Sequence, residues 1–368
     1  MVRFLIGGSP CTNWSIANSR GGRETTASGI GWELFRNYLI AKEKFRPDFF
    51  LYENNTSAAP AIRDQIKEEL QVDDGTLWTT GRAGRYIEIN SALVSAQKRH
   101  RFYIHNMGEI SQPEDRRIML SDILESGITD REKAVCLLGT YDHAGARNYL
   151  KKNHSQMIFE SVYPFGETGG KSFTLTATYY KGSNIRQTIA RHDRSLVAER
   201  IVSAGAAGRA EVQINGVCRE WPVYEVSGGA VAYNGDLYKV NLPDGYYIIR
   251  KLTVKECCRL QTMPDDYCRA VSDTQAYKAL GNGWTAEVIM HILKHAKVPQ
   301  DEEITVLSLY DGIGTGRYCF DRLGYKNIRY YAYEIDRYPI QIATSNYPDI
   351  IECGDAFAVR ETEWRLPE

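Results

Sequence analysis

The most constraining stretch of this 368-residue sequence is a strand–turn–helix–strand pattern between residues 304 and 334. It begins with a near-continuous apolar run, ITVLSLY, of the kind that a parallel strand buried on both faces requires. The run breaks at the turn DGIGTG (residues 311–316), a helical segment follows, and a second apolar strand ends at Glu334. Glycines at such a turn let a ligand approach the start of a helix. The pattern predicts a parallel α/β sheet with a ligand site at the carboxyl ends of its strands.

A second strand–turn pattern opens the chain. The apolar run RFLI leads into the turn GGSPC (residues 7–11), and strands and helices then alternate as far as residue 108. This alternation favours the same α/β fold class. The expected helices cover residues 31–45 and 58–71, and the expected strands cover residues 47–55, 84–94 and 101–107.

The middle of the chain has a different texture. Between residues 110 and 245, short β-branched or aromatic runs are separated by glycine, asparagine and aspartate turns. These runs predict a β-rich insertion in the α/β fold. We therefore expect the first part of an α/β domain over residues 1–109, an inserted domain over 110–245 and the second part of the α/β domain over 246–368.

Acidic residues stand at the tips of the expected strands near the C-terminus. Glu334 ends one strand, at a place where a carboxylate usually holds a ribose diol. Asp355 stands at the tip of the next strand, in reach of an adenine amino group. The turn lacks the G-x-G-x-x-G spacing of dinucleotide sites, and no second pattern for a pyrophosphate follows. S-adenosyl-L-methionine, a nucleoside cofactor without phosphate, fits these residues better.

Reactive side chains gather at the other end of the sequence. Cys11 follows the first strand, at the edge of the sheet where ligands bind, and is a candidate nucleophile. Glu53 stands at the tip of another strand, and Gln97, Arg99 and Arg101 alternate along an extended segment. By itself Cys11 is more simply a buried structural cysteine. A thiol, a carboxylate and guanidinium groups together, however, suit addition to a pyrimidine ring.

These motifs resemble those of the DNA (cytosine-5) methyltransferases. GGSPCTNWS is similar to the nucleophile loop of that family, LYENN to its acid motif and QKRHRFY to its Q-x-R-x-R motif. RKLTVKECCRLQTMPDDY and KALGNGWTAEVI resemble two further motifs of the family. VLSLYDGIGTGRYCFDRLG resembles its cofactor loop, and its sequence is most similar to that of the eukaryotic de novo branch. The matched segments leave out mainly the β-rich middle of the chain.

The resemblance implies transfer of a methyl group from S-adenosyl-L-methionine to C5 of a cytosine flipped out of double-stranded DNA. It implies that Cys11 attacks C6 and that Glu53 holds and protonates N3. Arg101 would hold O2 of the base, and Arg99 would support that site or a phosphate, unless it forms a surface ion pair. Expected cofactor contacts are Pro10, Asn282, Trp284, Tyr310, Asp311, Gly312, Ile313, Gly314, Thr315, Glu334, Ile335, Asp355 and Ala356. Core packing remains an alternative for Trp284, as a turn does for Asn282.

Two features depart from the family pattern. Family members begin with the cofactor loop, whereas here the nucleophile loop comes first and the cofactor strand comes last. The resemblance therefore implies a circularly permuted, Rossmann-like sheet with an inserted β-rich target-recognition domain. Chain ends in an exposed loop are generally tolerated. The second departure is Asn55, which replaces the usual valine and would alter packing under the base or add a polar contact.

The inserted domain carries a local positive charge. Residues 151–210 hold nine lysine or arginine residues against four acids, a net of +5, in a chain with a net charge of −1. Such a region can meet a phosphate backbone, and a solvated charged face is the alternative. Expected DNA contacts are Ser15, Gln97, Lys171, Arg186, Arg191 and Arg194.

Composition narrows the remaining classes. The chain is 43% hydrophobic and 25% charged, which is typical of globular proteins. No apolar run approaches the roughly 20 residues of a membrane helix, and no signal peptide is recognisable, so we expect a cytoplasmic protein. The compact, permuted form without regulatory domains favours a bacterial or phage source. The eight cysteines form no C-x-x-C pair, and no metal site is expected. A monomer is slightly favoured.

Three other functions stay open at this stage. An RNA cytosine-5 methyltransferase would share the fold, but that branch keeps the usual motif order and has a smaller insert. A catalytically silent DNA-binding accessory protein would lack the cysteine or the cofactor acids, all of which are present here. A cysteine hydrolase would need a histidine paired with Cys11, and the seven histidines show no pattern that demands one.

Overall fold

The computed structural model describes residues 1–15, 22–72, 84–152, 155–161, 209–214 and 217–367. These residues form two compact units. The first comprises Met1–Leu124, Glu132–Ala144 and Leu252–Glu368, and the second comprises Glu125–Arg131 and Gly145–Lys251. The chain therefore leaves the first unit twice, at residue 125 and at residue 145, and returns to it at residues 132 and 252.

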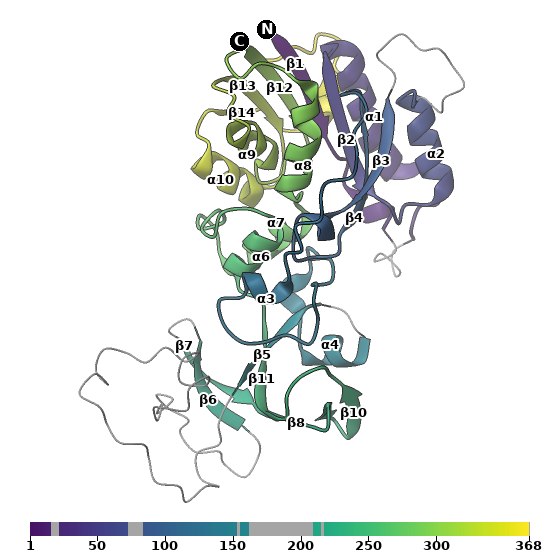
Figure 1. The fold of residues 1–368 in the computed structure, drawn as a ribbon. Helices are drawn as coiled ribbons and strands as arrows, with labels where there is room; N and C mark the ends of the chain where they lie inside the picture. The colour runs from purple at the N-terminus through teal and green to yellow at the C-terminus, as the bar shows by residue number, and fades with distance from the viewer. Residues whose placement is uncertain (16–21, 73–83, 153–154, 162–208, 215–216, 368) are drawn as a thin grey trace, which may run out of the picture. The chain divides into compact units, whose positions relative to one another are not determined.

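A seven-stranded sheet forms the centre of the first unit (Figure 1). Its strand order is β14-β13-β12-β1-β2-β4-β3, so strands from the two ends of the chain share one sheet. The strands are β1 (Val2–Gly7), β2 (Phe49–Asn55), β3 (Arg85–Asn90), β4 (His100–His105), β12 (Glu303–Leu309), β13 (Asn327–Tyr333) and β14 (Ile350–Glu352).

The sheet is mixed, whereas the sequence pattern predicted a parallel one. From β14 to β2 all neighbours pair in parallel, but β4 pairs antiparallel with both β2 and β3. The reason is the short link over residues 91–99, which contains only a 3₁₀ turn and cannot make the long crossover that parallel neighbours require.

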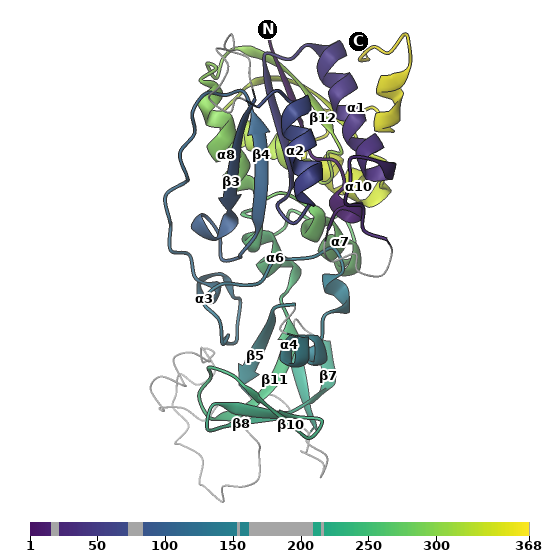
Figure 2. The same ribbon diagram turned by 90° about the vertical axis from the view of Figure 1, so that its right-hand side faces the viewer.

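Helices cover both faces of this sheet (Figures 1 and 2). Leu5 packs in one core cluster with Phe35 and Ile62, which belong to the helices α1 and α2. Its neighbour Phe4 points to the other face and stacks edge-on against Phe320 of α9. The helices of the unit are α1 (Gly29–Phe45), α2 (Pro60–Glu69), α3 (Leu120–Ile123), α6 (Val254–Leu260), α7 (Asp273–Asn282), α8 (Ala286–Leu293), α9 (Thr315–Arg322) and α10 (Arg337–Asn346).

The second unit is built mainly of antiparallel strands, which confirms the prediction of a β-rich middle region. Its five-stranded sheet has the order β10-β9-β8-β11-β5, and a separate hairpin joins β6 to β7. The elements are α4 (Ala146–Lys152), β5 (Met157–Ser161), β6 (Arg209–Ile214), β7 (Val217–Pro222), β8 (Tyr224–Ser227), β9 (Ala230–Tyr233), β10 (Asp236–Lys239) and β11 (Gly245–Lys251). Within the described part of the chain, no helix combines the length and apolar character needed to cross a bilayer.

Candidate active site

The cysteine loop is fixed to the tip of β2 by buried hydrogen bonds. The Asn54 side-chain amide donates to the Ser9 carbonyl at 3.0 Å, and the Ser9 hydroxyl lies 2.7 Å from the Tyr52 hydroxyl. Ser9 is 3% exposed and Asn54 is 1% exposed, so both bonds are shielded from water. Cys11 begins the 3₁₀ turn that follows, although its thiol lies outside what the structure describes. The sequence therefore brings the Cys11 turn and the acid-bearing strand to one edge of the sheet.

Gly8 sets how closely this loop approaches Glu53. A Cβ atom at position 8 would lie 2.7 Å from the Glu53 carbonyl oxygen and 2.8 Å from its carboxylate Oε2. Because real Cβ atoms do not come that close to backbone oxygen, only glycine fits there. Gly8 thus allows the cysteine loop to approach the catalytic candidate Glu53 closely.

Two side chains from distant segments hold the Glu53 carboxylate. Arg101 Nε lies 3.1 Å from Oε1, and the indole Nε1 of Trp284 donates to Oε2 at 2.9 Å. Arg101 pairs with Asn55 across β2 and β4, which makes it the diagonal neighbour of Glu53 on that face. The side chains of Glu53 and Arg101 are each 12% exposed, so a charge-assisted bond between them is largely protected from solvent.

Arg99 forms an internal clamp. Its side chain is 4% exposed and donates to the carbonyls of Leu137, Gly281 and Gly283 at 3.0, 3.2 and 2.8 Å. These bonds tie the segment that precedes β4 to the end of α7. The geometry gives Arg99 a role in holding backbone, with its guanidinium turned inward, and it contrasts with Arg101, which reaches Glu53.

Cys136 joins this cluster, and the sequence analysis did not identify it. Its sulfur accepts hydrogen bonds from Arg99 at 3.3 Å and from Arg101 at 3.9 Å. Burial raises the pKa of the Cys136 thiol, but the positive charges of Arg99 and Arg101 outweigh it and leave the pKa below its ordinary value. No local pattern around Cys136 announces the contact, because its partners lie 35 to 37 residues away.

Gln97, Asn55 and Ser15 differ in how the structure places them. Gln97 is fully buried and its amide donates to the Leu260 carbonyl at 2.8 Å, so it braces the packing of α6. Asn55 accepts a hydrogen bond from the Ser57 amide at 3.0 Å, so the residue found in place of valine shapes the turn after β2. Ser15 is half-buried just after the cysteine turn.

At the cofactor end, Glu334 is held by backbone amides. Its Oε2 accepts from the Gly312 amide at 3.0 Å, and its Oε1 accepts from the amides of Ile335 and Asp336 at 2.8 and 2.9 Å. Gly312 has a positive φ of 65°, and no atom lies within 4 Å of the place a Cβ would take. Ile335 is 73% exposed beside it. An open glycine backbone, an oriented carboxylate and an exposed apolar side chain fit a nucleoside with a ribose diol.

The other predicted cofactor residues surround this turn. Gly314 (φ 75°) precedes α9, which Thr315 begins, and Ile313 is 2% exposed with its carbonyl bonded to the Tyr267 hydroxyl. Tyr310 donates to the Leu34 carbonyl at 2.8 Å. Asp355 is exposed and caps the 3₁₀ turn that Ala356 begins, while Ala356 itself is buried. Pro10 and Asn282 are exposed in the same unit.

Two carboxyl groups beneath the glycine turn have raised pKa values. Burial raises the pKa of Asp311 to about 6, although Tyr330 donates a hydrogen bond to it at 2.5 Å. Burial also raises the pKa of Glu352 to about 7, and the charges of Asp311 and Glu334 add to the effect. With Glu334, these groups form one cluster of acids in which each negative charge raises the cost of the next.

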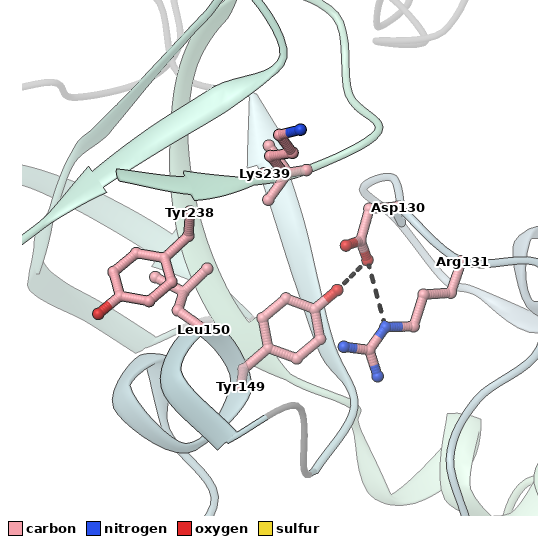
Figure 3. A pocket seen from close by; sticks show the side chains of 7 residues that line it. Asp130, Arg131, Tyr149, Leu150, Tyr238 and Lys239 are labelled. Carbon is pink, nitrogen blue, oxygen red and sulfur yellow. Dashed lines mark hydrogen bonds and ion pairs between the residues drawn. The ribbon is translucent and has the colours of Figure 1, made fainter. Parts of the chain in front are cut away.

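The second unit contains a polar pocket of about 280 Å³ (Figure 3). Asp130 in its wall accepts a hydrogen bond from the Tyr149 hydroxyl and pairs with Arg131 at 3.8 Å. Arg131 also stacks over the Tyr149 ring at 4.5 Å. The Asp130 carboxylate and the Arg131 guanidinium therefore neutralise each other within the pocket wall. The cations predicted to contact DNA, Lys171, Arg186, Arg191 and Arg194, lie outside the described residues.

Comparisons with known proteins identify the family of the chain. The family model of the C-5 cytosine-specific DNA methylases matches residues 1–297. The orphan methyltransferase M.SPRI of Bacillus phage SPR is 25% identical over 82% of this chain and 84% of its own length. The type II methyltransferase M1.ScrFI of Lactococcus lactis subsp. cremoris is 25% identical over 80% and 64%. The type II methyltransferase M.BanI of Aneurinibacillus aneurinilyticus is 27% identical over 79% of each. With the cysteine loop, the Glu53–Arg101 pair and the glycine turn in one unit, the chain belongs to the C-5 cytosine-specific DNA methylase family.

Proposed function

We propose that this DNA (cytosine-5-)-methyltransferase acts through a covalent bond between Cys11 and C6 of a cytosine flipped out of double-stranded DNA. The observation that carries the proposal is the Glu53 carboxylate, held by Arg101 and packed against Gly8 of the cysteine loop. C5 of cytosine is a poor nucleophile, and addition of a thiolate at C6 turns it into an enamine-like carbon. The family uses S-adenosyl-L-methionine, which supplies an electrophilic methyl group when bound.

Cys11, Glu53 and Arg101 each have a separate role in the proposed reaction. As the Cys11 sulfur bonds to C6, Glu53 protonates N3 and so prevents negative charge from accumulating on the ring. Arg101 lies against Glu53 and orients O2 of the base. After methyl transfer, a base removes the C5 proton, the C5–C6 double bond re-forms, and the electron pair of the S–C6 bond returns to Cys11. The proton on N3 returns to Glu53, so that the acid is ready for the next cycle. Holding base and cofactor in one geometry contributes much of the rate.

For the cofactor, we propose that Glu334 holds the ribose diol and Asp355 the adenine amino group, with Ile335 against the adenine ring. Gly312 would leave room beside the methionine part, whereas Gly314 allows close packing against Ala343. The support is the open backbone at Gly312 and the 73% exposure of Ile335. Apolar side chains of this size are normally buried, so an exposed one beside an ordered carboxylate suits a stacking surface.

We also propose that the chain is a circular permutation of the usual family order. The sequence of its cofactor loop is most similar to that of the eukaryotic de novo branch. Two observations support the permutation. The family match ends at residue 297, just before the cofactor strand β12 begins at Glu303. Numbered from β12, the strand order of the sheet becomes 3-2-1-4-5-7-6, which is the doubly wound order with one extra antiparallel strand.

The inserted second unit is the proposed target-recognition domain. Its antiparallel sheet and the net charge of +5 over residues 151–210 support contact with a DNA backbone.

A methyl-transfer assay tests the proposed function. Tritiated S-adenosyl-L-methionine is incubated with unmethylated double-stranded DNA, with wild type and with Cys11→Ala, and a structured RNA serves as the second substrate. Label in 5-methylcytosine of DNA, lost in the variant, is the expected result. Label in RNA and none in DNA would overturn the choice of substrate.

A further inference from the structure

We infer that Trp284 is a positioning residue for Glu53, and that it acts through the hydrogen bond between its indole N–H and the Glu53 carboxylate. This inference rests on the proposed role of Glu53 as the acid of the reaction. The motif comparison assigns Trp284 to the cofactor instead. The structure places its Nε1 2.9 Å from Glu53 Oε2, across 231 residues of chain.

The chemistry of the two partners of Glu53 makes this contact consequential. Tryptophan has a donor and no acceptor, and a guanidinium has donors only. Neither Trp284 nor Arg101 can therefore take the proton that Glu53 must deliver to the base. With one donor on each carboxylate oxygen, the plane of the carboxyl group is fixed while each oxygen keeps acceptor capacity for the substrate.

The segment that carries Trp284 is itself rigidly held. The carbonyl of the preceding residue, Gly283, accepts from Arg99 at 2.8 Å and from Gln261 at 3.3 Å. Thr285, the residue that follows, is 2% exposed and donates to Gln261 at 2.9 Å. Arg99 and Gln261 thus fix the chain on both sides of the indole. A fixed backbone on both sides of Trp284 lets its indole hold the Glu53 carboxylate in one orientation, as precise placement of a catalytic group requires.

The same segment borders the glycine turn of the cofactor site. A Cβ atom on Gly283 would lie 3.7 Å from the Ile313 side chain, which is ordinary contact distance. The segment therefore meets the glycine turn of residues 311–316 at Gly283 and meets Glu53 at the Trp284 indole. A role at the acid and a role at the cofactor make different kinetic predictions, because the first changes the rate with cofactor saturating and the second changes cofactor affinity.

The test uses Trp284→Phe, which keeps an aromatic ring and removes the N–H donor. Trp364→Phe is the matched control, because Trp364 donates its own N–H to the Tyr333 hydroxyl at 2.7 Å in the same unit. Single-turnover methylation of double-stranded DNA is measured with saturating cofactor, and the cofactor Kd is measured by equilibrium dialysis of tritiated S-adenosyl-L-methionine. Both variants are also placed in a Glu53→Gln background.

We expect Trp284→Phe to lower the single-turnover rate about tenfold, as loss of a hydrogen bond to a charged group does, with cofactor Kd unchanged within about twofold. In the Glu53→Gln background the same change is expected to have less than about a twofold effect, because interacting residues are not additive. Trp364→Phe should leave rate and Kd unchanged in both backgrounds.

Two results would overturn the inference. One is a raised cofactor Kd with an unchanged saturated rate, which would make Trp284 a cofactor contact. The other is an equal loss of rate in the wild-type background and in the Glu53→Gln background. An unchanged cofactor Kd also shows that Trp284→Phe is folded, and a wild-type enzyme that methylates no DNA would count against the proposed function and not against this contact.

Discussion

Two carboxylates stand near the carboxyl ends of strands of the same sheet, Glu53 on β2 and Glu334 directly after β13, and they are held in opposite ways. Glu334 accepts from three backbone amides, two of which belong to the next two residues. Glu53 accepts from the side chains of Arg101 and Trp284, which come from segments 48 and 231 residues further along the chain. On the proposed roles, the acid that binds the cofactor is held by local backbone, and the acid that takes part in the reaction is held by tertiary contacts.

The largest effect is expected at the nucleophile. Cys11→Ala should lower methyl transfer to DNA by roughly 10³-fold or more, because no other group replaces the thiolate that activates C5. The cofactor Kd should change little, since the substitution removes one thiol and leaves Pro10, the glycine turn of residues 311–316 and Glu334 in place. Tritium transfer to DNA measures the first quantity and equilibrium dialysis the second; a variant with more than about a tenth of wild-type activity would remove Cys11 from the mechanism.

Exchanging each acid for its amide sharpens the comparison directly. Glu53→Gln is expected to lower kcat about 10²-fold with little change in the cofactor KM, because it removes a proton donor. Glu334→Gln should instead raise the cofactor KM about tenfold and leave kcat within a few-fold, because it weakens binding in ground state and transition state alike. Steady-state kinetics with varied cofactor separates the two; identical effects of both variants would refute the division of roles.

The next largest effect is expected at Asn54, which anchors the cysteine loop. Asn54→Ala removes buried hydrogen bonds to the Ser9 carbonyl and to the Tyr52 hydroxyl, the latter at 3.0 Å. We expect kcat to fall about tenfold and the unfolding free energy to fall by roughly 1–3 kcal/mol, the cost of leaving buried partners unsatisfied. Asn55→Ala, one residue along, should affect kcat less than about threefold. Equal losses at both positions would show that the loop is not held through Asn54.

The smallest expected effect concerns pH and the cofactor end. The folded-state pKa of Glu352, about 7, lies above its ordinary value of 4.5, so its contribution to stability is full below 4.5 and is lost as pH rises through 7. Glu352→Gln removes this loss. Allowing for solvent screening of this half-buried group, we expect about 1 kcal/mol, or roughly 2–4 °C in Tm, gained at about pH 8 and little at about pH 5. Parallel Tm–pH curves for both proteins would contradict the shift.

The features that could be predicted from the sequence are the local ones, and the features that could not be predicted are mostly contacts between distant segments. The strand tips at Glu53 and Glu334, the glycine turn and the β-rich middle region are written in consecutive residues, and the structure contains each of them. The antiparallel placement of β4 follows from the short link over residues 91–99. The Trp284 bond to Glu53 and the Cys136 contact with Arg99, by contrast, join segments far apart in the chain. Such contacts follow from packing of the whole unit, and no periodicity of a single segment encodes them.

Covalent capture tests the central claim most directly. Double-stranded DNA carrying 5-fluorocytosine is incubated with S-adenosyl-L-methionine and enzyme, and adducts are separated on a denaturing gel. Because fluorine cannot leave C5 as a proton does, the bond between sulfur and C6 should persist. We predict an adduct with wild type and with Cys136→Ala, and none with Cys11→Ala. An adduct that survives Cys11→Ala, or that is lost with Cys136→Ala, would contradict the assignment of Cys11 as the nucleophile.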